Sequence, residues 1–208
     1  RCGMNIIFDL DGTLIDSSER LYRLFQHLVP ESTLTKDEYW NKKRNKIGHQ
    51  QILEERFPMV DFEDFQRRWL GLIETEGYLS FDLCYPDTIE TLKRLSLSSS
   101  LYLLTARQSE ENLKRELKKL NISDYFCQLY VTTSKYSKKE LLSELMAEKT
   151  ELFCCEDLFI SDMGKDIQLG KSLNFTTIAV AHGFMSKEKL MEYSPDYCVN
   201  RLSEILRG

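Results

Sequence analysis

After Pro86, short apolar segments alternate with segments of helical periodicity, and this alternation constrains the fold more than any other feature. Strands that alternate with helices of about 8–12 residues pair in parallel through right-handed crossovers. The pattern therefore predicts an α/β fold with a doubly wound, mainly parallel sheet. The expected strands are 101–104, 129–132, 158–161, 176–181 and 197–199, and the expected helices are 87–97, 110–120, 139–147, 165–173, 187–192 and one at the C-terminal end.

The first part of the chain follows a different pattern. Residues 5–8 are apolar and run into a glycine turn, which predicts one further buried strand. From 17 to about 78 apolar residues recur at helical spacing and no strand is apparent. We therefore expect an α/β core of residues 4–16 and 84–208, with an all-helical domain of residues 17–83 inserted after its first strand. Tyr39, Trp40 and Trp69 are expected in the core of that insertion.

Composition excludes several functional classes. Acidic residues outnumber basic ones 33 to 28, so the chain lacks the basic footprint of a nucleic-acid-binding protein. The longest apolar runs, 101–104 and 178–181, fall far short of the roughly 20 residues that span a bilayer. The three histidines are scattered and no cysteine pair has C-x-x-C spacing, which argues against zinc. We expect the six cysteines to be buried or incidental thiols of a cytoplasmic protein; they are Cys2, Cys84, Cys127, Cys154, Cys155 and Cys198.

Two carboxylates follow the first predicted strand. Asp9 and Asp11 are two apart on an extended segment, so both point to the same side. They stand at the carboxyl end of the strand, where open α/β sheets bind ligands. Their mutual repulsion favours a retained proton or a cation between them, and Gly12 allows the sharp turn that follows. The same motif also occurs as a simple solvated turn.

A second acidic pair follows the strand expected at 158–161. Asp162 and Asp166 are four apart, one turn of a helix, and can face the same point. Oxygen ligands without nitrogen or sulfur favour Mg²⁺. The alternative is that these residues only cap a helix N-terminus.

Two further positions could hold an anion. Thr105 follows the strand at 101–104, and its hydroxyl, with the backbone N–H groups of the next turn, could bind phosphate oxygens or merely cap the helix. A lysine just after the strand ending at Thr132 could offset the carboxylates. Lys135, Lys138 and Lys139 are all candidates for this position.

Taken together, these four motifs resemble the haloacid dehalogenase superfamily, in the group of phosphoglycolate phosphatases and β-phosphoglucomutases with a helical cap. The resemblance covers nearly the whole chain. Lys138 resembles the lysine of the third motif because Leu141 and Leu142 follow it at the family's helical spacing. Residues 176–180 and Gly183 are similar to the region after the metal motif, and the helical insertion is similar to the four-helix cap. Two departures are Ser161, where Gly or Glu usually precedes the aspartate, and the absence of a proline after the lysine.

The resemblance implies Mg²⁺-dependent hydrolysis of a small phosphorylated metabolite. Asp9 would attack phosphorus to form an aspartyl-phosphate, and Asp11 would act as general acid and then base. Thr105, the N–H of Ala106 and Lys138 would bind the phosphate oxygens. The metal ligands would be the carboxylates of Asp9 and Asp162 and the backbone carbonyl of Asp11, with Asp166 in support. We expect no nucleic-acid or membrane partner, and a monomer or weak homodimer.

Several alternatives stay open at this point. A phosphomutase also keeps Asp11, whereas a dehalogenase lacks an acid there, so the sequence argues against dehalogenation. A non-catalytic phospholigand-binding regulator is a third possibility. The helical insertion carries basic residues that either meet an anionic substrate or form a solvated face: Lys36, Lys42, Lys43, Arg44 and Lys46. Arg107 is a second candidate for contact with an anionic substrate.

Overall fold

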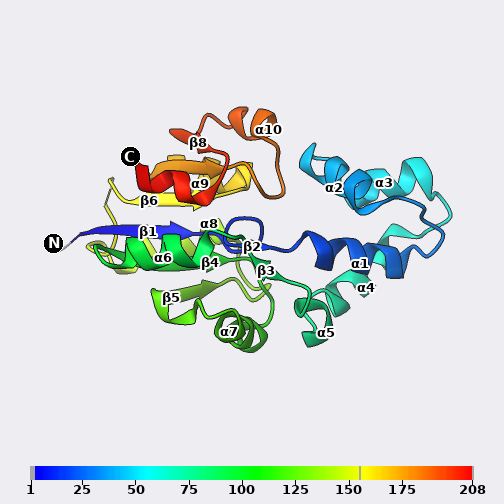
Figure 1. Cartoon of the computed structure of the whole chain (residues 1–208), viewed down its shortest axis with the longest axis horizontal. Helices are drawn as coiled ribbons and strands as arrows, with labels where there is room; N and C mark the ends of the chain where they lie inside the picture. Colours follow the sequence, from blue (N-terminus) through cyan, green and yellow to red (C-terminus); the bar gives the residue numbers. More distant parts are fainter. Residues whose placement is uncertain (1–2, 155, 208) are drawn as a thin grey trace.

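In the computed structural model, which describes residues 3–154 and 156–207, a six-stranded parallel sheet forms the centre of the molecule (Figure 1). Its strand order is β5–β4–β1–β6–β7–β8, and every neighbouring pair is parallel. The strands are β1 (Met4–Phe8), β4 (Ser99–Thr105), β5 (Phe126–Val131), β6 (Leu158–Ser161), β7 (Thr176–Val180) and β8 (Tyr197–Val199). The expected α/β class and parallel sheet are confirmed.

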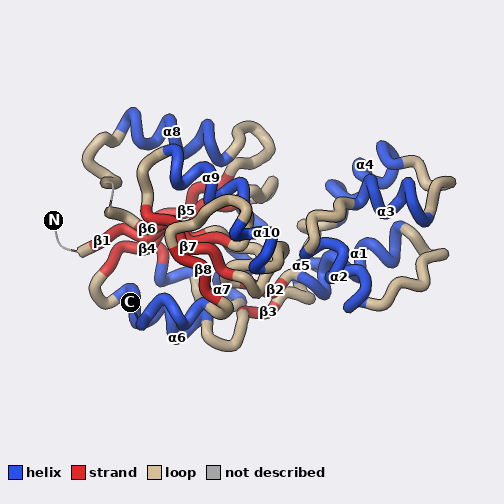
Figure 2. Tube along the Cα trace, turned by 90° about the horizontal axis from the view of Figure 1, so that it is seen from above, coloured by secondary structure: helices blue, strands red, loops and turns tan. Residues whose placement is uncertain are grey.

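Helices cover both faces of this sheet, as the near-continuous apolar strands require. Ile6 and Phe8 pack on one face with residues of α6 (Thr88–Ser96) and α7 (Glu110–Lys119). Ile7 points to the opposite face, toward α8 (Lys138–Glu148) and α9 (Gly164–Ser172). Figure 2 shows α8 and α9 on one side of the strands and α6 on the other.

The remaining elements of the core are short. Helix α10 (Lys187–Met191) follows β7, and the chain passes through a 3-10 turn at Ser123–Tyr125 before β5. The C-terminal helix expected from the sequence is a 3-10 helix, Leu202–Arg207, rather than an α-helix. Its Leu202 is buried against the same face as α6.

Five helices are inserted between two very short strands. They are α1 (Ser18–Leu28), α2 (Lys36–Arg44), α3 (His49–Arg56), α4 (Phe62–Leu72) and α5 (Glu76–Leu79). We call them the helical insertion. The strands β2 (Ile15–Asp16) and β3 (Leu83–Cys84) pair antiparallel and carry the chain into and out of it. Figure 1 shows the insertion beyond the end of the sheet toward which β1 points.

The helical insertion has a hydrophobic core of its own. Phe25 and Tyr39 are buried at its centre with Phe65, and Trp69 packs against them. Trp40 is only half-buried and contacts Phe184 of the α/β core, with ring centroids 5.2 Å apart. Tyr39 and Trp69 thus lie in the core of the insertion as expected, and Trp40 also contacts the loop after β7. The exact division into residues 4–16 and 84–208 against 17–83 stays a prediction.

Two other expectations concern cysteines and membranes. Cys2 and Cys155 lie outside the described residues, Cys84 and Cys198 are half-buried, and Cys127 and Cys154 are exposed. Within the part of the chain that the structure describes, no helix has both the length and the apolar character to cross a membrane.

Candidate active site

The predicted site residues gather at the carboxyl edge of three adjacent strands. Asp9 directly follows β1, Thr105 ends β4 and Asp162 directly follows β6. Because β4, β1 and β6 are neighbours in the sheet, their following loops converge at one place. A cavity of about 790 Å³ opens there. Its lining includes Asp9, Asp11, Thr105, Ala106, Lys138 and Asp166.

Lys138 joins two of the carboxylates. Its Nζ lies 2.8 Å from Asp9 Oδ1 and 2.8 Å from Asp166 Oδ2. Burial lowers the pKa of Lys138, but the charges of Asp166 and Asp9 outweigh it and raise that pKa above its ordinary value. The lysine is thus a fixed cation beside Asp9. Its rivals Lys135 and Lys139 are exposed, although Lys139 also lines the cavity.

Local sequence explains why Lys138 has this place. It is the first residue of α8, and the side chain of Ser137 caps the helix by accepting a hydrogen bond from the Glu140 N–H at 3.1 Å. The S-x-x-E pattern of Ser137 and Glu140 is a sequence signal that favours Lys138 over its two neighbours.

Ser161, the departure from the family pattern, has a definite place. Its hydroxyl donates to Asp166 Oδ2 at 2.7 Å and accepts from the Met163 N–H at 3.1 Å. The serine therefore orients the carboxylate that in turn holds Lys138.

Asp162 is completely buried, and two hydrogen bonds hold its carboxylate. Thr13 Oγ1 donates to its Oδ1 at 2.9 Å, and the Phe184 N–H donates to its Oδ2 at 2.7 Å. Two glycines allow this approach. A Cβ on Gly12, where φ is +83°, would lie 2.0 Å from Asp162 Oδ2, and one on Gly183 would lie 2.3 Å from the same atom.

Only a few side chains among the described residues could bind a divalent cation. Those residues bring together no group of three or more His, Cys, Asp or Glu that could hold a metal. The fit lies in the buried pair Asp9 and Asp162, whose carboxyl groups both accept from the Thr13 hydroxyl, at 3.4 Å and 2.9 Å. Burial raises the pKa of both, and the charge of Asp9 raises that of Asp162 further. Two carboxyl groups in this arrangement retain a proton between them or bind a cation in its place.

Asp11 is bound by two arginines. Arg107 contributes Nε at 2.8 Å from Oδ2 and Nη2 at 2.9 Å from Oδ1, and Arg20 contributes Nη2 at 2.5 Å from Oδ1. Ser17 Oγ adds a hydrogen bond at 2.8 Å. Burial opposes ionisation, yet Arg107 and Arg20 hold the pKa of Asp11 well below its usual range. In this structure Asp11 is an ionised carboxylate turned toward the guanidinium groups.

The arginines continue into a buried network. Arg20 Nε donates to Asp82 Oδ1 at 2.9 Å, and Arg107 Nη2 donates to Glu116 Oε1 at 2.8 Å. Both Asp82 Oδ2 and Glu116 Oε2 are buried, and neither has a hydrogen-bond partner among the described residues. Burial raises the pKa of Asp82 to about 9, with Glu116 and Asp11 adding to the effect against Arg20. The network holds the three carboxyl groups of Asp11, Asp82 and Glu116 but only two guanidinium groups. Asp82 therefore keeps a proton at neutral pH.

Sequence reasoning missed much of this network. Arg107 was a candidate for contact with a substrate anion, but its side chain is only 3% exposed and is committed to Asp11 and Glu116. That expectation is not supported, because buried carboxylates already surround the guanidinium. The position of Arg20 could have indicated that it is buried. It shares a face of α1 with Leu24 and Leu28, where an apolar residue is expected.

The helical insertion contacts the α/β core on two sides. Arg44 donates to the backbone carbonyls of Gly183 at 2.5 Å and Ala181 at 2.8 Å. On the other side, the Glu74 carboxylate accepts from the N–H groups of Gln108 and Ser109 at 2.9–3.1 Å. The insertion thereby rests on the loops after β7 and β4, next to the cavity.

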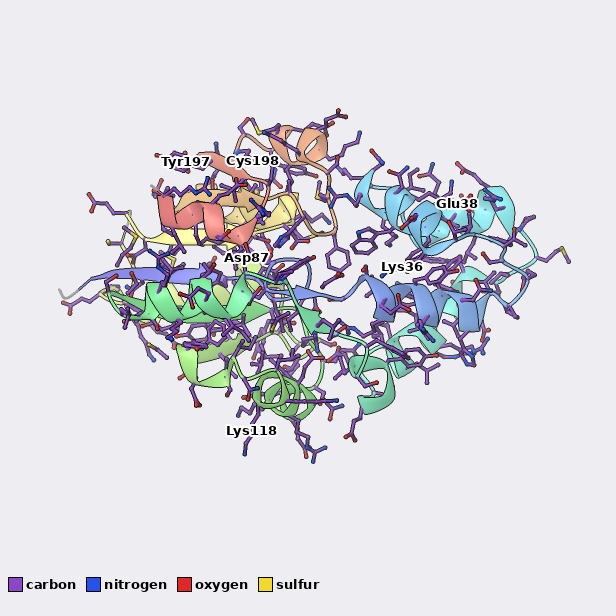
Figure 3. All side chains as sticks on the ribbon, viewed as in Figure 1. Lys36, Glu38, Asp87, Lys118, Tyr197 and Cys198 are labelled. Carbon is purple, nitrogen blue, oxygen red and sulfur yellow. The ribbon has the colours of Figure 1, made fainter. Side chains whose placement is uncertain are left out.

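The predicted basic cluster divides among several environments. Lys36 pairs with Glu19 at 3.0 Å and lies within the insertion (Figure 3). Arg44 binds the carbonyls described above, and Lys46 Nζ donates to the Tyr193 hydroxyl at 2.8 Å. Lys42 lines none of the described cavities, whereas Lys43 and Lys46 do.

Comparisons with known proteins agree with the fold and the motifs. Residues 6–180 match the family model of haloacid dehalogenase-like hydrolases. Among curated proteins, a phosphoglycolate phosphatase of Aquifex aeolicus is 27% identical and a pyrophosphatase PpaX of Bacillus mycoides 25%; each match covers 97% of this chain and 94% of the relative.

Solved structures extend this likeness. A haloacid dehalogenase-like family hydrolase from Streptococcus pneumoniae superposes with a TM-score of 0.78 at 23% identity, covering 99% of this chain and 98% of the other. A HAD-superfamily hydrolase from Geobacter sulfurreducens gives 0.72 at 17% identity, covering 99% and 96%. The resemblance drawn from the four motifs is confirmed, and the chain belongs to the haloacid dehalogenase-like hydrolase family.

Proposed function

We propose that this protein is a Mg²⁺-dependent phosphatase that hydrolyses a small phosphomonoester through an aspartyl-phosphate. The observation that carries the proposal is Asp9, a buried carboxylate at the edge of the cavity with the Lys138 ammonium 2.8 Å away. The lysine offsets negative charge where a phosphoryl group would meet Asp9. The phosphatase names of the matched relatives also support it.

The first step transfers the phosphoryl group to the protein. A carboxylate oxygen of Asp9 forms a bond to phosphorus while the ester P–O bond breaks, and Asp11 gives a proton to the leaving oxygen. Thr105, the Ala106 N–H and Lys138 line the cavity and bind the phosphoryl oxygens. Proton donation requires Asp11 to take up a proton and leave Arg20 and Arg107, since a carboxylate bound to two guanidiniums is a poor acid.

The second step regenerates the free Asp9 carboxylate. Water attacks phosphorus, Asp11 takes its proton, and the bond to Asp9 breaks to release inorganic phosphate. Mg²⁺, when bound, would neutralise charge on the phosphoryl group and on Asp9. Asp9, Asp162 and the Asp11 carbonyl would hold it, and Asp166 would support it.

The helical insertion is proposed to act as a cap that selects the substrate. Two of its contacts with the α/β core, made by Arg44 and Glu74, are to loops beside the cavity. We further expect a cytoplasmic protein that is a monomer or a weak homodimer. Sedimentation of the purified protein would check its oligomeric state.

The test is phosphate release from a panel of phosphomonoesters with and without Mg²⁺. Phosphoglycolate, sugar phosphates, nucleotides and p-nitrophenyl phosphate would be compared for the unmodified protein, Asp9→Asn and the exposed control Asp37→Asn. We expect metal-dependent turnover that Asp9→Asn loses and Asp37→Asn keeps. Substantial turnover by Asp9→Asn would refute the covalent scheme, and isomerised product without free phosphate would identify a mutase.

A further inference from the structure

The segment between β7 and α10 binds both the helical insertion and the carboxylate of Asp162. It comprises residues 181–186, and we call it the β7–α10 loop. Its Phe184 N–H donates to Asp162 Oδ2 at 2.7 Å, and the other hydrogen bond to this carboxylate comes from Thr13 at 2.9 Å. The position of the loop therefore sets one of the two hydrogen bonds that orient a proposed metal ligand.

Helix α2 binds the same loop through three polar contacts. Arg44, its last residue, donates to the Gly183 carbonyl at 2.5 Å and to the Ala181 carbonyl at 2.8 Å. The carbonyl of Arg44 in turn accepts from the Ser186 N–H at 3.0 Å. These contacts lie on both sides of Phe184 in the chain, so Arg44 fixes the loop around the amide that reaches the carboxylate.

An aromatic contact adds to this interface. The Trp40 ring packs against the Phe184 ring, with their centroids 5.2 Å apart and an angle of 58° between their planes. Trp40 and Arg44 are four residues apart, so they lie on one face of α2. Figure 1 shows α2 opposite the orange segment that contains α10. One face of a helix of the insertion therefore contacts this loop through an arginine and a tryptophan.

Both side-chain hydrogen bonds of Arg44 end on this loop. Within the part of the chain that the structure describes, no carboxylate lies within 4.0 Å of its guanidinium. The attachment of the insertion at Glu74 involves a different loop, the one after β4. The effect of Arg44 on Asp162 can therefore be separated from the attachment of the insertion in general.

The loop and the carboxylate lie too close together to move independently. A Cβ on Gly183 would lie 2.3 Å from Asp162 Oδ2. Asp162 is completely buried, and a buried acceptor that loses its donor is costly because water does not replace it. A shift of the loop therefore weakens the bond from the Phe184 N–H and displaces the carboxylate.

We propose that Arg44 is a positioning residue for Asp162: it holds the β7–α10 loop so that the Phe184 N–H orients the carboxylate for Mg²⁺. This inference rests on the proposed function, because it takes Asp162 as a ligand of the metal. The helical insertion thereby controls the affinity of the site for the metal. Linkage requires the converse as well, so metal bound at Asp162 strengthens the contact between Arg44 and the loop by the same factor.

Hydrogen exchange of the Phe184 amide tests the first link, in the metal-free protein. Arg44→Met removes the donors to the loop, and Arg44→Lys keeps the charge and an ammonium donor. We expect exchange at Phe184 to accelerate at least tenfold in Arg44→Met and less in Arg44→Lys, because exchange reports local opening. Lys42→Met is the matched control, since a residue two positions away faces another side of the same helix. Exchange in Arg44→Met equal to that of the unmodified protein overturns the proposal.

The affinity for Mg²⁺, measured by calorimetry, tests the second link. We expect the Kd to rise about 10–100-fold in Arg44→Met, the usual effect of lost support around a metal ligand, and to be partly restored in Arg44→Lys. Lys42→Met should keep the Kd of the unmodified protein. Glu74→Ala should keep it too, because it removes the other attachment and leaves the β7–α10 loop in place. An equal rise in Glu74→Ala would show that the site responds to any loosening of the insertion, which overturns the specific role of Arg44.

Neither readout requires turnover, which separates this inference from the proposed function. A protein that shows both effects but releases no phosphate from any ester supports the role of Arg44 and refutes the phosphatase. Metal-dependent phosphate release with an unchanged Kd in Arg44→Met leaves the phosphatase standing and refutes this role. An unmodified protein that does not bind Mg²⁺ refutes both.

Discussion

The guanidinium of Arg107 binds both carboxylate oxygens of Asp11, with Nε 2.8 Å from Oδ2 and Nη2 2.9 Å from Oδ1. The same Nη2 also donates to Glu116 at 2.8 Å, so one buried cation holds two carboxylates from distant parts of the chain. This contact links the loop after β1 to helix α7. It makes Arg107 a positioning residue for Asp11.

Removal of Arg107 is expected to be costly. Arg107→Met leaves the buried Glu116 and the half-buried Asp11 without their shared partner, and loss of one partner of a buried ion pair costs about 3–5 kcal/mol. Urea unfolding of the metal-free protein measures the change. Arg115→Met on the same helix removes an exposed ion pair with Glu111 and should cost no more than about 0.5 kcal/mol. Equal, small effects in the two variants would contradict the role given to Arg107.

Asp82 should make stability depend on pH. Its folded pKa of about 9 lies above the ordinary value of 3.8, so between these values the folded state holds a proton that the unfolded state has released. Stability then falls as pH rises through this window. Asp82→Asn keeps an oxygen acceptor for Arg20 and removes the titration. We expect the fall in the free energy of unfolding between pH 5 and pH 9 to be smaller in Asp82→Asn than in the unmodified protein. The difference should be at least about 1.4 kcal/mol, which corresponds to one pKa unit.

The control for this comparison is Asp124→Asn, because Asp124 is exposed. Urea unfolding at pH 5, 7 and 9 should give the same slope for Asp124→Asn and the unmodified protein. If Asp82→Asn also follows that slope, Asp82 does not hold the proton assigned to it.

Gly183 should matter through the position of Asp162. A Cβ there would lie 2.3 Å from Asp162 Oδ2 and 2.2 Å from the Gly12 carbonyl oxygen, so Gly183→Ala must displace the carboxylate or the backbone. We expect Mg²⁺ affinity, measured as the metal-induced rise in Tm, to fall by about 10–100-fold, the usual effect of lost support around a metal ligand.

Gly71→Ala provides the comparison for Gly183→Ala. A Cβ on Gly71 would meet no atom within 4 Å, and alanine within α4 is expected to stabilise the helix by about 1 kcal/mol. Its Mg²⁺ response should equal that of the unmodified protein. An unchanged response in Gly183→Ala would show that Asp162 tolerates displacement or does not bind the metal.

The sequence predicted elements and residues that depend on local pattern. Strand β6 has the expected bounds and β1 is one residue longer than expected, whereas β4 runs over Ser99–Thr105 against the expected 101–104; Asp9 and Asp162 directly follow β1 and β6. Strands β2 and β3 were missed because two residues each are too few to show a period. The choice of Lys138 among three lysines depended on family spacing, whereas the structure shows it at the start of α8.

Contacts between distant segments could not be read from the same patterns. Arg20 and Asp82 are 62 positions apart and meet only because β2 and β3 bring the two ends of the insertion together. Arg107 follows the strand that ends in Thr105, as an anion-binding residue would, and its exposure depends on whether a carboxylate reaches it from another loop. In this fold the Asp11 carboxylate reaches Arg107 from the loop after β1, and the local sequence around Arg107 cannot indicate this contact.

Glu74 should protect two backbone amides of the α/β core. Its carboxylate accepts from the N–H groups of Gln108 and Ser109, just before α7, and these bonds tie the helical insertion to the loop after Thr105. Glu74→Ala removes both acceptors. We expect the exchange of these two amides with deuterium, followed by NMR or mass spectrometry, to accelerate at least tenfold, because exchange reports local opening. Glu76→Ala, two residues further on at the start of α5, should leave them unchanged. Equal exchange in all three proteins would show that the insertion does not rest on this loop in solution.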